Sequence, residues 1–195
     1  NVQKLENKIE SRLEKVEDRL DKLDMNPTYA GAGITKVNPT KVDTLQRILE
    51  ESDLEVIGTA RGYSRLDKED DAVMTDEAMT LARKADIVLY FFGLNDEASE
   101  SEGLERTHLK IPKNQIDLME QLSNENQNIV GIISAGSCIE MPWEKHLKAI
   151  LHGYLFGQAG MGAVFELLTG KLSPSGKLAE TIVKRYEDEP NVRYY

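Results

Sequence analysis

The sequence predicts an α/β fold, a parallel doubly wound sheet with helices on both faces, plus an N-terminal coiled-coil helix. Short apolar runs typical of buried strands, at 87–92 and 129–134, alternate with segments of helical periodicity. The first 24 residues repeat apolar side chains at spacings of three and four instead, without Gly or Pro. With 195 residues, the chain has room for one such domain and an appendage. We therefore expect a coiled-coil oligomerisation helix at 1–24 and an α/β domain at 25–195.

The charges of the segment 1–24 indicate how it would assemble. Its apolar seam is formed by Val2, Leu5, Ile9, Leu13, Val16, Leu20 and Leu23. At about 100° per residue, the lysines and arginines line one flank of this seam and the acids line the other. In a parallel assembly, the acidic flank of one helix faces the basic flank of the next. We therefore predict a parallel homo-oligomer; the alternative is a helix that docks on its own domain.

The composition narrows the classes of partner. A formal net charge of −10 and a pI near 4.9 argue against nucleic-acid and anionic-membrane surfaces, because both need clustered Lys and Arg. Cys138 is the single cysteine, so an internal disulfide is excluded, which fits a cytoplasmic location. The sequence shows no signal-peptide core and no apolar run of membrane length.

The elements follow from periodicity along the chain. Residues 25–40 are rich in Gly, Pro and Asn and predict a loop. Amphipathic patterns predict helices, and short apolar runs predict strands. The expected helices are 41–51, 75–84, 114–122 and 161–168, and the expected strands are 54–57, 87–92, 129–134 and 149–154.

The chain's most apolar strand leads directly into its densest cluster of acids. Gly93 ends the strand 87–92, and Asp96, Glu97, Glu100, Glu102 and Glu105 follow within ten residues. This segment has no helical or strand period, so we expect a loop at the carboxyl end of a central strand. Open α/β sheets place their ligand sites at such ends.

Five sequence motifs point to a known family. They are ESEGLERTH with LKIPKNQ at 100–115, GAG with VNPT at 31–40, EMPW at 140–143, GYLFGQAGMG at 153–162 and SPSGKL at 173–178. In this order they closely resemble glycoside hydrolase family 3, the β-glucosidase family, in the α/β-sandwich domain that follows its catalytic barrel. The resemblance extends from residue 26 to about residue 184.

The resemblance implies a catalytic role for one residue of this chain and a nucleophile that lies outside it. Glu102 matches the family's general acid/base. Neighbouring acids would raise the pKa of Glu102 by like-charge repulsion, which Arg106 opposes. The family's nucleophile is an Asp on a (β/α)₈ barrel that this chain does not contain. We therefore expect half of a retaining glycosidase, acting on a β-glucoside-type carbohydrate, incomplete alone, needing no cofactor and completed by a barrel on another chain.

Two rival functions stay open. One is a non-catalytic oligomeric scaffold or sugar-binding module. The other is a nucleotide- or phosphate-binding domain that uses the glycines of 157–162, although close helix-to-strand packing would also explain those glycines.

The remaining chemistry-bearing residues predict structural roles. The acid cluster lacks the spacing of an EF-hand loop, and His108, His146 and His152 show no metal-ligand spacing, so we predict no metal site. Cys138 follows a buried strand outside any GxSxG motif and reads as a packed thiol. We expect Trp143 to anchor a loop against the core.

Overall fold

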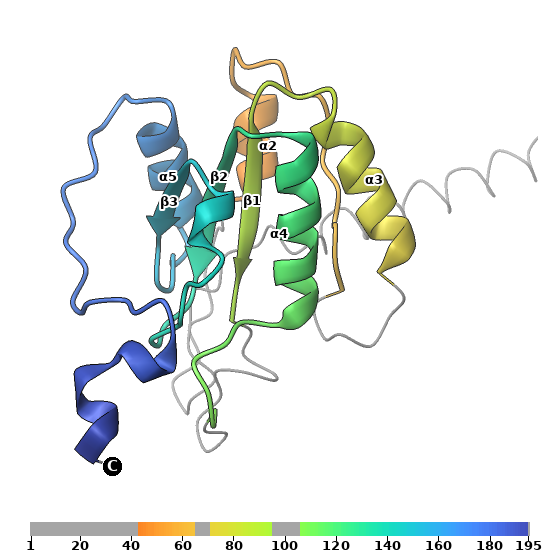
Figure 1. Cartoon of the computed structure of the whole chain (residues 1–195). Coiled ribbons are helices and arrows are strands. Elements are labelled where there is room, and N and C mark those ends of the chain that lie inside the picture. The colour runs from red at the N-terminus through yellow and green to blue at the C-terminus, as the bar shows by residue number, and fades with distance from the viewer. Residues whose placement is uncertain (1–42, 65–70, 95–105, 195) are drawn as a thin grey trace, which may run out of the picture.

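The computed structural model describes residues 43–64, 71–94 and 106–194. It contains a sheet of three parallel strands, β1 (Val88–Gly93), β2 (Ile129–Ser134) and β3 (Ala149–His152), in the order β1-β2-β3 (Figure 1). The register runs from Val88 opposite Ile129 to Gly93 opposite Ser134. The predicted parallel sheet is thus confirmed. The predicted coiled coil and its boundary at residue 24 lie outside the described residues.

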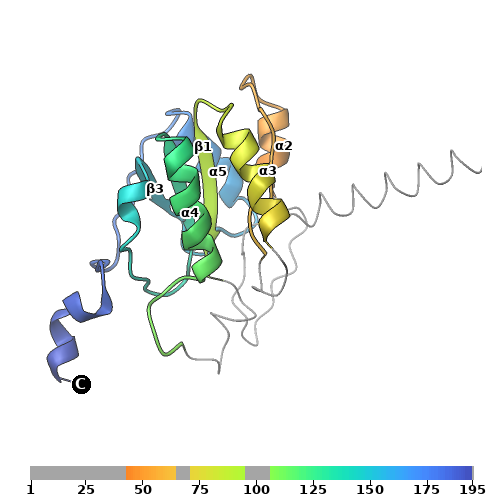
Figure 2. The ribbon, with the colours of Figure 1, turned by 45° about the vertical axis from the view of Figure 1, so that its right-hand side comes forward.

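Helices cover both faces of the sheet, as predicted. The pair α3 (Ala72–Ala82) and α4 (Lys113–Glu125) packs on one face, and α2 (Leu45–Glu50) and α5 (Gly160–Leu168) pack on the other (Figure 2). Three short 3₁₀ helices complete the described elements: η1 (Glu144–His146), η2 (Tyr186–Asp188) and η3 (Pro190–Tyr194).

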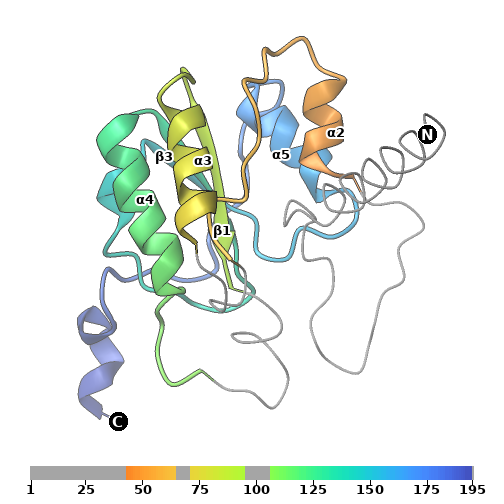
Figure 3. The same ribbon diagram turned by 90° about the vertical axis from the view of Figure 1, so that its right-hand side faces the viewer.

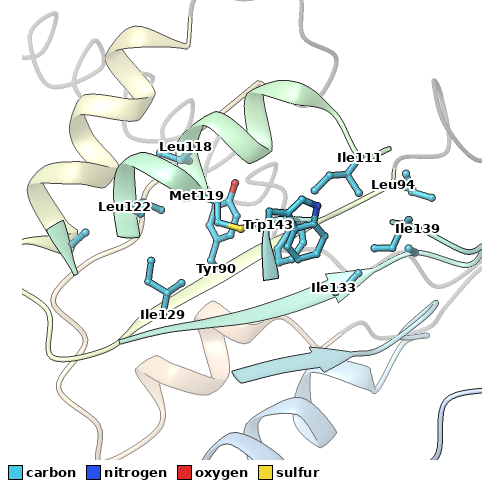
Figure 4. Packing of buried hydrophobic residues seen from close by; sticks show 13 residues of the cluster. Tyr90, Leu94, Ile111, Leu118, Met119, Leu122, Ile129, Ile133, Ile139 and Trp143 are labelled. Carbon is cyan, nitrogen blue, oxygen red and sulfur yellow. The ribbon is translucent and has the colours of Figure 1, made fainter. Parts of the chain in front are cut away.

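The larger core lies between β1, β2 and the helices α3 and α4. Tyr90 stacks on Phe92 with ring centroids 5.3 Å apart, and the Phe92 ring meets Trp143 edge-on at 5.0 Å. Trp143 comes from the loop after β2 and is only 2% exposed (Figure 4). The expectation that Trp143 anchors a loop against the core is confirmed. Buried aromatic pairs of this kind dominate core energetics.

A smaller core lies on the opposite face. It joins Leu45 of α2 and Ile132 of β2 to Met161 and Val164 of α5. Apolar side chains of β2 therefore point into both layers, because successive strand residues alternate between faces. This explains the nearly continuous apolar run that identified β2 in the sequence.

One predicted strand is wrong. Residues 54–57 are described, but they form no strand. Leu54, Val56 and Ile57 are 53%, 42% and 44% exposed. Their β-branched and apolar composition suits a strand, but a strand also requires a hydrogen-bonded neighbour, which this segment lacks among the described residues.

Candidate functional site

The acidic segment is attached at the carboxyl edge of the sheet. Residues 95–105, which include Glu102, lie outside the described residues, whereas Leu94 and Arg106 on either side are described. The Leu94 N–H donates to the backbone oxygen of Ser134, the last residue of β2, at 2.9 Å. The segment therefore leaves the sheet beside the end of β2.

The start of the segment is held by a buried amide side chain. The Gly93 N–H donates to Oε1 of Gln115 at 2.9 Å, and Gln115, in the first turn of α4, is 4% exposed. Gly93 has φ 145°, and a Cβ there would lie 1.9 Å from the Ser134 oxygen. Only glycine fits this conformation and this close approach. The sequence indicated Gly93 as the strand end, whereas the role of Gln115 was missed.

The end of the segment is held by Arg106. Its Nη2 donates to Oγ of Ser137 and to the carbonyl oxygen of Cys138, both at 2.8 Å. Its Nη1 donates to the His108 carbonyl oxygen at 3.3 Å. Charged donors make the stronger class of hydrogen bonds. Arg106 was expected to act only through its charge on Glu102, and its contact with the loop after β2 was missed.

The same loop also holds the C-terminal part of the chain. Glu140 is 8% exposed, and its Oε2 accepts a hydrogen bond from the Tyr186 N–H at 3.0 Å. The Met141 N–H donates to the Val183 carbonyl oxygen at 3.0 Å, and the Glu140 N–H donates to the Leu109 oxygen at 2.9 Å. Residues 137–144 thus connect two distant parts of the chain, 106–109 and 183–186, at one edge.

Tyr154 is a second feature of this edge that the sequence did not reveal. It has φ 52°, the only left-handed backbone among the described residues other than glycine. Its carbonyl oxygen accepts from Ser134 Oγ at 3.2 Å, and its ring lies 4.1 Å from the His152 ring. Such strain persists where surrounding contacts fix the backbone.

The surroundings of Cys138 and of the glycines near Phe156 favour structural roles for these residues. Burial, followed by the neighbouring Glu180 carboxylate, raises the pKa of the Cys138 thiol, which supports the prediction of a packed, unreactive thiol. The Phe156 side chain fills the space beside Gly153 and Gly160, where a Cβ would lie 1.7 Å and 2.4 Å from it. Within 157–162, close packing therefore explains Gly160 without a phosphate, whereas Gly157 has φ 67° and no atom within 4 Å of an added Cβ.

Two further observations concern the described part of the chain. No three of its His, Cys, Asp and Glu side chains gather in a way that could hold a metal ion. None of its helices has the length and apolar character needed to cross a membrane.

Known proteins show clear similarity to this chain. The sequence profile of the "Glycosyl hydrolase family 3 C-terminal domain" matches residues 7–195. The exo-α-(1→6)-L-arabinopyranosidase of Bifidobacterium breve is 41% identical over 168 residues, which is 85% of this chain and 22% of the relative. The thermostable β-glucosidase B of Acetivibrio thermocellus is 36% identical over 167 residues, with the same two coverages.

A solved structure supports the same relationship. The crystal structure of the family 3 β-glucosidase of Bifidobacterium adolescentis superposes with a TM-score of 0.76 at 40% identity, and covers 85% of this chain and 24% of that one. The chain spans about a fifth of the length of the curated relatives it matches. On the profile match and these relatives, the chain belongs to the glycosyl hydrolase family 3 C-terminal domain family.

Proposed function

We propose that this domain supplies the general acid/base, Glu102, of a retaining glycosidase. One observation carries the proposal. The acidic segment leaves the sheet beside Ser134 and returns at Arg106, which is bound to Ser137 and Cys138. Both ends are thus attached at the carboxyl edge of the sheet, where α/β folds place their ligands.

The reaction needs a second carboxyl group. A retaining mechanism uses two carboxyl groups about 5 to 5.5 Å apart, one of which attacks the sugar. Glu140, the buried acid at this edge, already accepts a hydrogen bond from Tyr186. Glu180 lies against the Cys138 thiol. We therefore propose that the nucleophile belongs to a barrel domain outside this chain.

The names of the relatives suggest the substrate class. One relative is a β-glucosidase and another is an exo-α-(1→6)-L-arabinopyranosidase. Because this chain spans only 22% of either relative, most of the sugar-binding surface would lie in the remaining part. We propose β-D-glucosides as the first substrate class and α-L-arabinopyranosides as the second.

A chimera tests this function. Residues 26–195 would replace the matching part of the A. thermocellus β-glucosidase B, and hydrolysis of 4-nitrophenyl β-D-glucoside and 4-nitrophenyl α-L-arabinopyranoside would be measured. We expect turnover by the chimera that falls by roughly 10²-fold or more in Glu102→Gln, since general acid/base catalysis contributes about 10²–10⁴-fold. Glu100→Gln, two residues away, is the matched control and should keep most of the activity.

Three outcomes would contradict the proposal. Turnover by the 195-residue chain alone would show that it needs no external nucleophile. Full activity of the Glu102→Gln chimera would assign the proton transfer to another residue. A folded but inactive chimera would favour the non-catalytic module.

We further propose that residues 1–24 assemble the domain as a parallel homo-oligomer. The segregated charges of this segment support the proposal. Sedimentation of the chain with and without residues 1–24 tests it, and a monomer in both cases would contradict it.

A further inference from the structure

His146 connects the chain that follows β2 to helix α4. It is the last residue of η1, which lies beside α4 (Figure 3), and its backbone N–H donates to the Trp143 carbonyl oxygen at 3.0 Å. Its imidazole Nδ1 lies 2.8 Å from Oγ of Ser123, a residue of α4 that is only 9% exposed. Trp143 belongs to the loop 137–144, to which Arg106 is attached. The contact between His146 and Ser123 therefore helps to hold this loop against α4.

The hydrogen bonds of Ser123 determine where the neutral imidazole carries its proton. A hydroxyl group has a single proton to donate. The Ser123 hydroxyl donates it to the Glu120 carbonyl oxygen at 2.8 Å, an atom that can only accept. The contact between Ser123 and His146 therefore requires a proton on Nδ1 of His146. In the neutral imidazole, Nε2 is then an acceptor without a proton.

Nε2 of His146 is buried and has no hydrogen-bond partner among the described residues. The nitrogen lies 3.9 Å from Oε1 of Glu120, and the two side chains are 19% and 55% exposed. In the neutral state, two acceptors are thus close together, although buried polar atoms are nearly always hydrogen-bonded. A proton on Nε2 would place a charged donor beside the carboxylate instead. These surroundings suit the charged imidazolium better than the neutral ring.

The other acids of η1 and α4 are paired with basic side chains: Glu144 with Lys184, Asp117 with Lys113, and Glu125 with Arg83. Lys145, the neighbour of His146 in η1, is exposed, so water and salt screen its charge. In the described part of the chain, Glu120 is therefore the carboxylate of these two elements that a protonated His146 would meet.

We propose that His146 and Glu120 form a pH-dependent clamp between the loop 137–144 and α4. At high pH, the imidazole is bound to α4 through Nδ1 and Ser123 alone. When the pH falls, Nε2 takes up a proton from the solvent and pairs with Glu120, which adds a second attachment. The stabilisation by this pair is present in acid and is lost as the pH rises and the imidazole releases the proton. The clamp goes beyond the glycosidase function and does not depend on Glu102.

NMR of the ¹⁵N-labelled chain tests the proton position, with the other two histidines as internal controls. Nδ1 of His108 accepts from the Lys110 N–H at 3.2 Å, and Nδ1 of His152 accepts from the Tyr154 N–H at 3.1 Å. When neutral, these two rings must carry their proton on Nε2. At about pH 8.5, where histidine is ordinarily neutral, long-range ¹H–¹⁵N spectra should show His146 alone protonated at Nδ1. A proton on Nε2 of neutral His146 would overturn the proposal.

A double-mutant cycle measures the ion pair itself. His146→Gln, Glu120→Gln and the double variant would be unfolded in urea at about pH 5.5 and about pH 8.5, on either side of the ordinary histidine titration. We expect a coupling of roughly threefold in the folding equilibrium constant at the lower pH, because partly exposed ion pairs are weak, and none at the higher pH. Equal coupling at both pH values, or none at either, would refute the clamp.

Glu125→Gln is the matched control for this cycle. Glu125 is on the same helix but pairs with Arg83, so it should not couple to His146 at either pH. Coupling of Glu125 as strong as that of Glu120 would mean that the general charge of α4, and not this pair, causes the effect.

Amide hydrogen exchange tests whether the pair acts on the loop. The Leu147 N–H donates to the Glu144 carbonyl oxygen at 3.1 Å, so its exchange reports the opening of η1. After correction for the intrinsic pH dependence of exchange, its protection should be roughly threefold higher at about pH 5.5 than at about pH 8.5 in the parent chain. In Glu120→Gln the protection should not change with pH. Constant protection in the parent chain, or the same rise in the variant, would contradict the clamp.

Discussion

Arg106 offers a direct test of how the acidic segment is positioned. Its guanidinium makes two hydrogen bonds of 2.8 Å, to Ser137 and Cys138, and one of 3.3 Å, to His108. Buried hydrogen bonds from charged donors contribute about 1.5–3 kcal/mol each, but this site is partly exposed, which reduces the total. We take about 2 kcal/mol for the set, which corresponds to about a thirtyfold change between the anchored and the released segment.

The assay uses the chimera and two leaving groups. Arg106→Ala should lower kcat by about thirtyfold for cellobiose, whose leaving oxygen needs a proton, and far less for 2,4-dinitrophenyl β-D-glucoside, whose leaving group departs without one. KM should change little, because in the proposed function Arg106 fixes the end of the acidic segment and does not bind the sugar. Arg106→Lys keeps the charge and one donor group, so it should restore part of the loss.

Arg83→Ala is the matched control. Arg83 pairs with Glu125 at 3.1 Å on the surface of α3 and α4, so its loss should leave kcat for both substrates unchanged. Equal loss for cellobiose and the dinitrophenyl glucoside in Arg106→Ala would refute the reasoning. It would mean that the variant damages the fold or the sugar site rather than the proton donor.

Further variants test the fold by urea denaturation. Met119→Ala, at 0% exposure, should lower the free energy of unfolding by about 3 kcal/mol through lost packing, whereas Val73→Ala, at 79% exposure, should change it by less than about 0.5 kcal/mol. Gly93→Ala should destabilise strongly, because its Cβ would lie 1.9 Å from the Ser134 oxygen. Burial raises the pKa of the Tyr90 hydroxyl well above its usual value of about 10. The unfolded chain therefore loses this proton first, and stability should be complete below about pH 10 and fall above it. This fall should be smaller in Tyr90→Phe.

A specific result would contradict each of these predictions. Similar losses for Met119→Ala and Val73→Ala would contradict the assigned core. A Gly93→Ala variant as stable as the parent would contradict the close approach to Ser134. An equally steep loss above pH 10 in Tyr90→Phe would show that other groups cause it.

The elements that the sequence predicted correctly are those whose burial shows in their own residues, as a continuous apolar run or an amphipathic pattern. Residues 129–134 were predicted with the bounds of β2, because a strand covered on both faces shows as a continuous apolar run. Residues 54–57 carry a similar local pattern, yet they form no strand. The difference is the pairing partner. β2 forms hydrogen bonds with β1 on one edge and with β3 on the other, and this pairing depends on distant parts of the chain.

The sequence predicted where β1 ends but not which residues hold that edge of the sheet. The strand end at Gly93 is confirmed, whereas the role of Glu102 stays a prediction, because residues 95–105 lie outside the described residues. The hydrogen bonds that hold that edge join Arg106 to Ser137 and Gly93 to Gln115, over 31 and 22 residues. No local period or motif records such long-range contacts, so Gln115 was missed and Arg106 was interpreted by its charge alone.

The buried Glu140 carboxylate connects the C-terminal part of the chain to the carboxyl edge of the sheet. Its donor is the Tyr186 N–H, so trimming the chain before Tyr186 would remove the hydrogen bond that this carboxylate accepts from the C-terminal part. The loss would fall on residues 137–144, where Arg106 is also attached. A shortened gene product would therefore lose this edge, where we propose that the proton donor is attached, before it lost its sheet.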